Sequence, residues 1–178
     1  MSYYSERDLI NTVNIYSSRD ANFSAETLNE SSQIRRYYDF FLSHSSSDFS
    51  LVIGLYKKLT EKGYIVFLDK IETKDISIQN IANELKEAMN NSEYILYAHT
   101  HNSINSKWVP WELGYFDSNK GKDKILVMPI INEYGKAKYV GQEYLTQYKE
   151  IEVEDLTYIE STEQKRKKFF EDIIKGAF

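Results

Sequence analysis

The residue best suited to chemistry is Glu112, a carboxylate between aromatic side chains in the segment SKWVPWELGYF, residues 106–116. At helical spacing, this glutamate shares one face with Trp108, Trp111, Tyr115 and Phe116. If that face is partly buried, the rings exclude water and the carboxylate is poised for chemistry. The structural alternative is a first-turn glutamate that the helix dipole stabilises. The stripe alone favours this alternative, because structural carboxylates outnumber catalytic ones.

The composition narrows the functional classes. A chain of 178 residues with 42% hydrophobic content suits one domain with a substantial core. The net charge of -5 offers no general field for nucleic acid or an anionic membrane, so neither is expected as a partner. The absence of cysteine excludes disulfides, thiolate nucleophiles and Cys-ligated zinc, and it favours the cytoplasm. The opening residues lack the apolar core of a signal peptide, and no apolar run approaches the roughly 18 residues that span a bilayer.

Several familiar catalytic motifs are missing. The histidines His44, His99 and His101 make no usual metal spacing, so no metal is expected, and the last two are interpreted as structural or rim residues. There is neither a Gly-x-Gly-x-x-Gly motif nor a Walker A loop. The neighbours Ser43 and His44 lack a nucleophile elbow, and adjacent strand residues point different ways, which argues against a hydrolase triad. The Ser-rich loop after them either holds phosphate oxygens or serves ordinary turns and caps.

Strand-like runs alternate with helical spacing from Tyr37 onward. Asp48 is expected to cap the first helix and Gly63 to end it, while Pro129 suits an edge strand or a strand end. This alternation predicts an α/β fold, an open parallel sheet with helices on both faces and right-handed crossovers. The predicted strands are residues 37–43, 65–69, 94–98, 125–131 and a short fifth at 148–153, and the predicted helices lie at 51–59, 78–89 and 108–116.

The chain is expected to have three parts. Residues 1–36 read as an N-terminal extension of one or two short helices, and their deletion should leave the sheet intact. Residues 37–156 form the α/β domain, and residues 157–178 close it with a helix. The apolar residues of that helix are expected to face the body: Phe169, Phe170, Ile173 and Ile174. The basic cluster 165–168 is most simply its solvated face, with phosphate binding as the alternative.

The candidate site lies at one edge of the predicted sheet. In open parallel sheets, ligands bind beyond the carboxyl ends of the strands. Ser43 and His44 follow the first strand and Asp69 ends the second, while the helix that bears Glu112 begins on the same rim as the third strand ends. One crevice is therefore expected to collect Ser43, His44, Asp69, Trp108 and Glu112.

Three motifs in order resemble the Toll/interleukin-1 receptor (TIR) domain family in its bacterial form. They are YDFFLSHSSSD at 38–48, GYIVFLD at 63–69 and SKWVPWELG at 106–114. The resemblance covers roughly residues 37–153 and implies a flavodoxin-like fold with a five-stranded parallel sheet. The loop after Asp69 lacks a glycine that many family members carry, which leaves the mode of assembly open.

The resemblance also implies an activity. Catalytic members of the family cleave the nicotinamide–ribose bond of NAD with a glutamate four residues after a tryptophan, the positions of Glu112 and Trp108 here. It makes Glu112 the catalytic residue and Ser43, His44, Asp69 and Trp108 substrate-binding residues, with NAD as substrate and no cofactor. A single carboxylate suffices, because nicotinamide leaves a pyridinium as a neutral group and needs no general acid, unlike an ordinary glycosidic leaving group.

Short bacterial members with an N-terminal segment resemble the TIR component of Thoeris anti-phage defence. This implies an ADP-ribose-derived signal, expected to be cyclic, that activates a separate effector protein, and it implies self-association on activation. Two alternatives stay open at this stage. A non-enzymatic interaction module would leave NAD untouched, and a plain NAD hydrolase would act by depletion and release only ADP-ribose.

Overall fold

The computed structural model describes residues 2–19, 37–68 and 78–176. Its helices are α1 (Glu6–Arg19), α3 (Phe49–Glu61), α4 (Ile78–Asn90), α5 (Val109–Lys120) and α6 (Thr162–Gly176). Its strands are β1 (Tyr38–Ser43), β2 (Val66–Leu68), β3 (Ser92–His99), β4 (Ile125–Pro129) and β5 (Lys149–Glu150). Single 3₁₀ turns lie at η1 (Ser46–Asp48), η2 (Ser103–Asn105), η3 (Lys122–Lys124), η4 (Glu143–Gln147) and η5 (Glu154–Tyr158). Within the described ranges, no helix is long and apolar enough to cross a membrane.

The strands form one open sheet in which every pairing is parallel, as the sequence predicted. Their order is β2-β1-β3-β4-β5, and Ser43 at the end of β1 pairs in register with Tyr97 of β3. Because the order of the strands reverses between β1 and β3, ligand binding is expected beyond their carboxyl ends. Pro129 is the last residue of β4, so it ends a central strand and removes no donor from the middle of the ladder.

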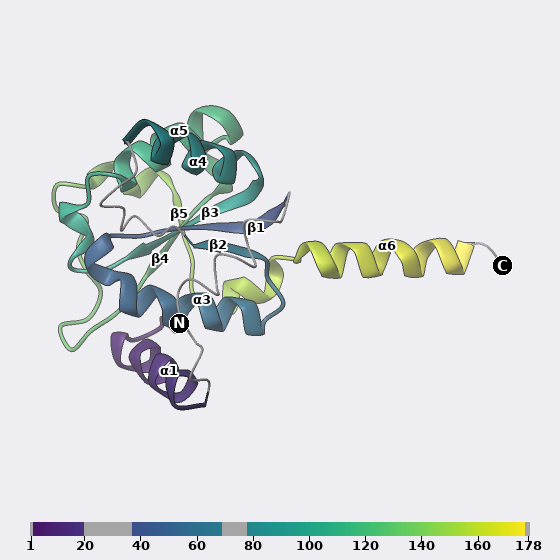
Figure 1. The fold of residues 1–178 in the computed structure, drawn as a ribbon, viewed down its shortest axis with the longest axis horizontal. Helices are drawn as coiled ribbons and strands as arrows, with labels where there is room; N and C mark the ends of the chain where they lie inside the picture. Colours follow the sequence, from purple (N-terminus) through teal and green to yellow (C-terminus); the bar gives the residue numbers. More distant parts are fainter. Residues whose placement is uncertain (1, 20–36, 69–77, 177–178) are drawn as a thin grey trace.

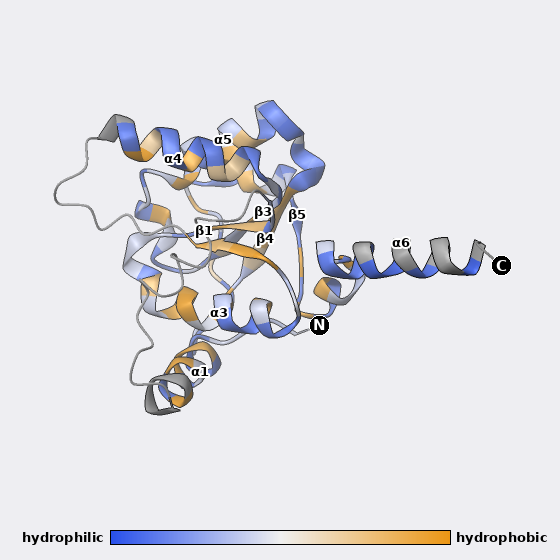
Figure 2. Ribbon diagram, turned by 45° about the vertical axis from the view of Figure 1, so that its right-hand side comes forward, coloured by the Kyte–Doolittle hydropathy of each residue, from blue (hydrophilic) through white to orange (hydrophobic). Residues whose placement is uncertain are grey.

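Two helical layers cover the sheet (Figure 1). Helices α3 and α1 lie on one side, and α4 and α5 lie on the other. Figure 2 shows the apolar faces of α3, α4 and α5 turned toward the strands. Successive residues of a strand face opposite sides, so Phe40 and Leu42 pack toward α3 while Phe41 packs toward α4 and α5. Both faces of β1 are buried, which explains its almost unbroken apolar run.

Helix α1 is part of the domain body rather than a separable extension. Leu9 is 0% exposed and belongs to the core on the α3 side, and Ser5 forms a parallel bridge with Ile131. Tyr3 donates its hydroxyl to Glu150 at 2.7 Å. Removing these residues would expose core surface. The expectation that deletion of residues 1–36 leaves the sheet intact stays a prediction, and this packing argues against it. Residues 20–36 lie outside the described ranges.

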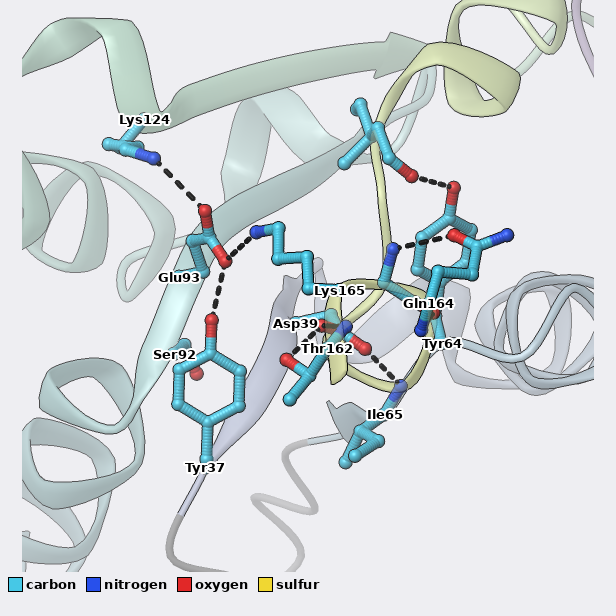
Figure 3. Close-up of polar contacts among 12 residues, drawn as sticks. Tyr37, Asp39, Tyr64, Ile65, Ser92, Glu93, Lys124, Thr162, Gln164 and Lys165 are labelled. Atoms are coloured by element: carbon cyan, nitrogen blue, oxygen red, sulfur yellow. Dashed lines mark hydrogen bonds and ion pairs between the residues drawn. The ribbon is translucent and has the colours of Figure 1, made fainter. Parts of the chain in front are cut away.

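Helix α6 is anchored at its amino end and then runs away from the sheet (Figure 1). The backbone N–H and the hydroxyl of Thr162 both donate to Asp39 Oδ1 at 2.7 Å, and the Ile65 N–H donates to Asp39 Oδ2 at 2.8 Å (Figure 3). Asp39 therefore fastens the start of α6 to the amino end of β1. The four apolar side chains predicted to face the body, Phe169, Phe170, Ile173 and Ile174, lie outside the described part of the structure.

Glu93 provides the second anchor of α6 and gives it a pH dependence. Burial acts to raise the pKa of Glu93, but hydrogen bonds from Lys165, Tyr37 and Lys124 outweigh it and lower the pKa from 4.5 to about 2. A carboxylate whose pKa is lowered by folding stabilises the folded state at pH values above its ordinary pKa. This stability is lost as the pH falls toward the folded-state pKa. At neutral pH, we expect Glu93→Gln to lower the free energy of unfolding by about 1 kcal/mol, because the network is partly exposed.

Urea unfolding of both proteins at about pH 7 and about pH 3 tests this. The difference between wild type and Glu93→Gln should shrink at the lower pH. A difference that stays constant would contradict the assignment of the stabilising charge to Glu93.

Candidate functional site

The structure brings Ser43 and Glu112 into direct contact at the carboxyl edge of the sheet. Ser43 ends β1, and Glu112 lies in the first turn of α5. The Ser43 hydroxyl donates to Glu112 Oε2 at 2.5 Å, and the two residues are 1% and 2% exposed. A carboxylate removed from water needs such donors, since an unpaired buried charge is costly. The pair lies at the reversal point of the strand order, where the fold is expected to bind a ligand.

Local sequence explains how Glu112 reaches this position. Pro110 occupies the first turn of α5, where its missing N–H costs no helical hydrogen bond. The Glu112 N–H donates to the Trp108 carbonyl at 2.9 Å, so Trp108 begins the turn that presents the carboxylate. The positive end of the helix dipole also favours a negative charge in this turn. Val109 and Leu113 pack beneath it in the core on the α4 and α5 side.

The predicted aromatic stripe of α5 is buried to different depths. Phe116 is buried with Glu112, whereas Trp108, Trp111 and Tyr115 are half-buried along the flank. The two indole rings meet edge to face with centroids 5.5 Å apart, and the Trp111 ring stacks on Tyr115 at 5.9 Å. Trp111 and Tyr115 each directly precede one of the two buried residues, so they lie about 100° around the helix from them, and all the rings still pack against the same core. Both indoles pack against this core, and Trp108 is the one at the start of α5.

His44 lies beside Ser43 in sequence but packs toward the opposite layer. Its ring lies 6.0 Å from the ring of Phe49 at the start of α3, and its Nδ1 lies 3.3 Å from the Leu42 carbonyl. Burial lowers the pKa of His44 below its ordinary value, so the imidazole is neutral at pH 7. The structure therefore pairs Ser43, and not His44, with Glu112. Asp69, the remaining predicted site residue, lies outside the described residues.

A buried polar network in the loops after β1 and β3 was not assigned from the sequence. Asp48 occupies the N-cap position of α3, as expected, but its side chain makes no capping hydrogen bond. Its carboxylate instead accepts hydrogen bonds from Thr100 Oγ1 at 2.5 Å and from Asn102 Nδ2 at 2.8 Å. The available signal was the run of polar residues at 99–103, where β3 ends.

His99 ends β3 inside this network. It is fully buried, its Nδ1 lies 3.1 Å from Ser103 Oγ, and its ring meets that of Tyr139 at 4.8 Å. Burial lowers the pKa of His99 to about 4, so it stays neutral at physiological pH. His101 is exposed. Across the described ranges, no cluster of three or more His, Asp or Glu side chains is arranged to hold a metal ion.

The architecture is that of a TIR domain. A family model described as "TIR domain" matches residues 40–173, and the chain belongs to this family. The chain is 32% identical over 160 residues to the "Probable 3' cyclic ADP-D-ribose synthase ThsB'" of Bacillus cereus (strain MSX-D12). The matched region covers 83% of this chain and 82% of that protein.

Two further relatives are longer proteins that match over part of their length. The "Putative cyclic ADP-D-ribose synthase TIR2" of Cytobacillus dafuensis is 30% identical over 88 residues, covering 47% of this chain and 23% of that protein. The "NAD(+) hydrolase TirS" of Staphylococcus aureus (strain MSSA476) is 32% identical over 99 residues, covering 52% of this chain and 33% of that protein. The family expected from the sequence motifs is thus confirmed.

Proposed function

We propose that this chain cleaves the nicotinamide–ribose bond of NAD and that Glu112 is its catalytic carboxylate. The observation that carries the proposal is the burial of Glu112 beside Ser43 at the point where the strand order reverses. Relatives named as cyclic ADP-D-ribose synthases and as an NAD(+) hydrolase support NAD as the substrate.

The proposed reaction requires one negative charge in a site from which water is excluded. When the C–N bond breaks, its electron pair passes to the pyridinium nitrogen, nicotinamide leaves neutral, and positive charge develops on the ribose. The Glu112 carboxylate would stabilise that charge, either directly or through the ribose hydroxyls. The Ser43 hydroxyl would hold the orientation of the carboxylate. Trp108 would form a wall against the substrate, and Asp69 completes the proposed set of substrate-binding residues.

We propose a cyclic product and a signalling role. Water as the acceptor gives ADP-ribose, while a nucleophile within the same molecule gives a cyclic isomer. The relative that matches most of this chain along most of its own length is named as a 3' cyclic ADP-D-ribose synthase, which favours the cyclic outcome. In this proposal the nucleotide activates a separate effector protein in anti-phage defence, and the enzyme self-associates when activated.

Product analysis after incubation of concentrated protein with NAD tests the proposal. We expect nicotinamide together with a second product that mass detection identifies as dehydrated relative to ADP-ribose, because cyclisation consumes no water. ADP-ribose as the sole second product would instead support the plain hydrolase. If neither free protein nor protein mixed with lysate of phage-infected cells releases nicotinamide, the interaction module is favoured.

A further inference from the structure

Asp48 joins the two loops from which the candidate site is built. One loop follows β1 and begins with His44, directly after Ser43. The other follows β3 and ends at Trp108, where α5 begins. Asp48 lies in the first loop, and both of its described hydrogen-bond donors, Thr100 and Asn102, lie in the second. The residue is 1% exposed, so water does not compete for these contacts.

The use of this carboxylate is unusual for its position. Aspartate at an N-cap ordinarily accepts a hydrogen bond from its own helix, which contributes about 1 kcal/mol. Here the side chain makes no capping hydrogen bond. It accepts hydrogen bonds instead from two residues of the second loop, which lie 52 and 54 residues further along the chain. A buried carboxylate is costly without good partners, so these two donors determine where the second loop can lie.

The second loop transmits this constraint because it is internally bonded. The Asn102 N–H donates to Thr100 Oγ1 at 3.1 Å, and the Thr100 N–H donates to Ser103 Oγ at 3.1 Å. Ser103 in turn donates to the Thr100 carbonyl at 2.7 Å, and the Ser106 N–H donates to the Ser103 carbonyl at 3.1 Å. The chain is therefore held turn by turn from Thr100 to the residues just before Trp108.

We propose that Asp48 is a positioning residue that fixes Trp108 over the site through Thr100 and Asn102. This inference rests on the proposed function, because it assigns Trp108 a contact with substrate. The Glu112 N–H donates to the Trp108 carbonyl, but the carboxylate is held in addition by the Ser43 hydroxyl and by the packed body of α5. Loss of the Asp48 link should therefore weaken substrate binding more than it slows the chemical step.

Two variants and a double variant test the link, with one matched control. Asp48→Asn keeps the shape but places an amide N–H₂ against one of the donors, and Thr100→Val removes only the hydroxyl donor. Asp39→Asn is the control, since Asp39 is also buried and accepts three hydrogen bonds, but at the opposite end of β1. We expect Asp48→Asn and Thr100→Val each to raise KM for NAD about tenfold with kcat within about threefold of wild type.

In the double variant, KM should rise by much less than the product of the two single-variant increases, because both changes remove the same interaction. Asp39→Asn should lower stability while leaving KM unchanged. If Asp39→Asn raised KM as much as Asp48→Asn, a general loss of rigidity would explain the data and the proposal would be wrong. Unchanged KM in Thr100→Val would also overturn it, and that variant stays informative if Asp48→Asn does not fold.

Hydrogen exchange separates failure of this inference from failure of the proposed function. If wild-type protein does not cleave NAD, the proposed activity is wrong, but amide exchange over residues 100–108 still tests the link. Faster exchange there in Asp48→Asn and not in Asp39→Asn supports Asp48 as the group that holds the loop. Equal exchange in the two variants contradicts it.

Discussion

Glu112→Gln is expected to reduce NAD cleavage by about a thousandfold, the loss typical of removing one preorganised electrostatic group from an active site. The substitution removes the negative charge and nearly keeps the shape. The Ser43 hydroxyl, which donates to Glu112 Oε2 in the wild type, can still donate to the amide oxygen of glutamine. Because a neutral amide is less costly to bury than a carboxylate, folding should be unaffected or slightly favoured. The loss should therefore fall on kcat, with little change in KM.

The measurement is the steady-state rate of nicotinamide release, followed for both proteins at matched concentration. Glu87→Gln is the appropriate control, because it makes the same chemical change at an exposed position of α4. It should retain wild-type turnover. Activity that survives in well-folded Glu112→Gln protein would remove Glu112 from the reaction and, with it, the mechanism proposed above.

Gly54→Ala is expected to lower the free energy of unfolding by about 1–3 kcal/mol, the usual cost of overpacking a core. A Cβ atom at this position of α3 would lie 2.3 Å from the Leu9 carbonyl oxygen and 2.8 Å from its carbonyl carbon. The contact is with backbone, so no side chain can rotate away. Helix α1 would have to move off α3, and Leu9 would lose its burial in the core.

Gly114→Ala supplies the matched control for this effect. It also lies within a helix, but nothing is found within 4 Å of the Cβ that alanine would add. Since alanine is favoured over glycine in helices by about 1 kcal/mol, this variant should be as stable as wild type or slightly more stable. Urea unfolding curves of the three proteins decide the matter. Equal stability of the two variants would mean that α1 does not depend on close approach at Gly54.

The sheet could be predicted from sequence because its signal is local. Apolar runs of strand length alternate with helical spacing, and the parallel order follows from that alternation. Helix α5 continues to Lys120, beyond the predicted end at Phe116, because its polar last turn carries no apolar periodicity. The attachment of α1 could not be predicted from the weak spacing of Leu9 and Val13, since it depends on a close backbone approach at Gly54.

The candidate site was predictable to a similar degree. The rule that strand ends meet at one edge correctly placed Ser43 near Glu112. The same rule grouped His44 with them, although strand alternation turns it toward Phe49. The partners of Asp48 could not be inferred, because an aspartate at this position can either cap its own helix or accept hydrogen bonds from another loop. Only the three-dimensional arrangement decides between them.

The segment before α1 determines the order in which the molecule can be completed during synthesis. Ser2 accepts a hydrogen bond from the Val153 N–H at 3.0 Å, and Tyr4 accepts one from the Ile131 N–H at 3.0 Å. Helix α1 can meet α3 as soon as residue 61 has left the ribosome, but the donor to the Tyr4 carbonyl emerges only with residue 131 and the donor to the Ser2 carbonyl only with residue 153. Contacts between such distant residues carry a large loop-closure cost and form late. The segment before α1 is therefore among the last parts of the domain to find its place.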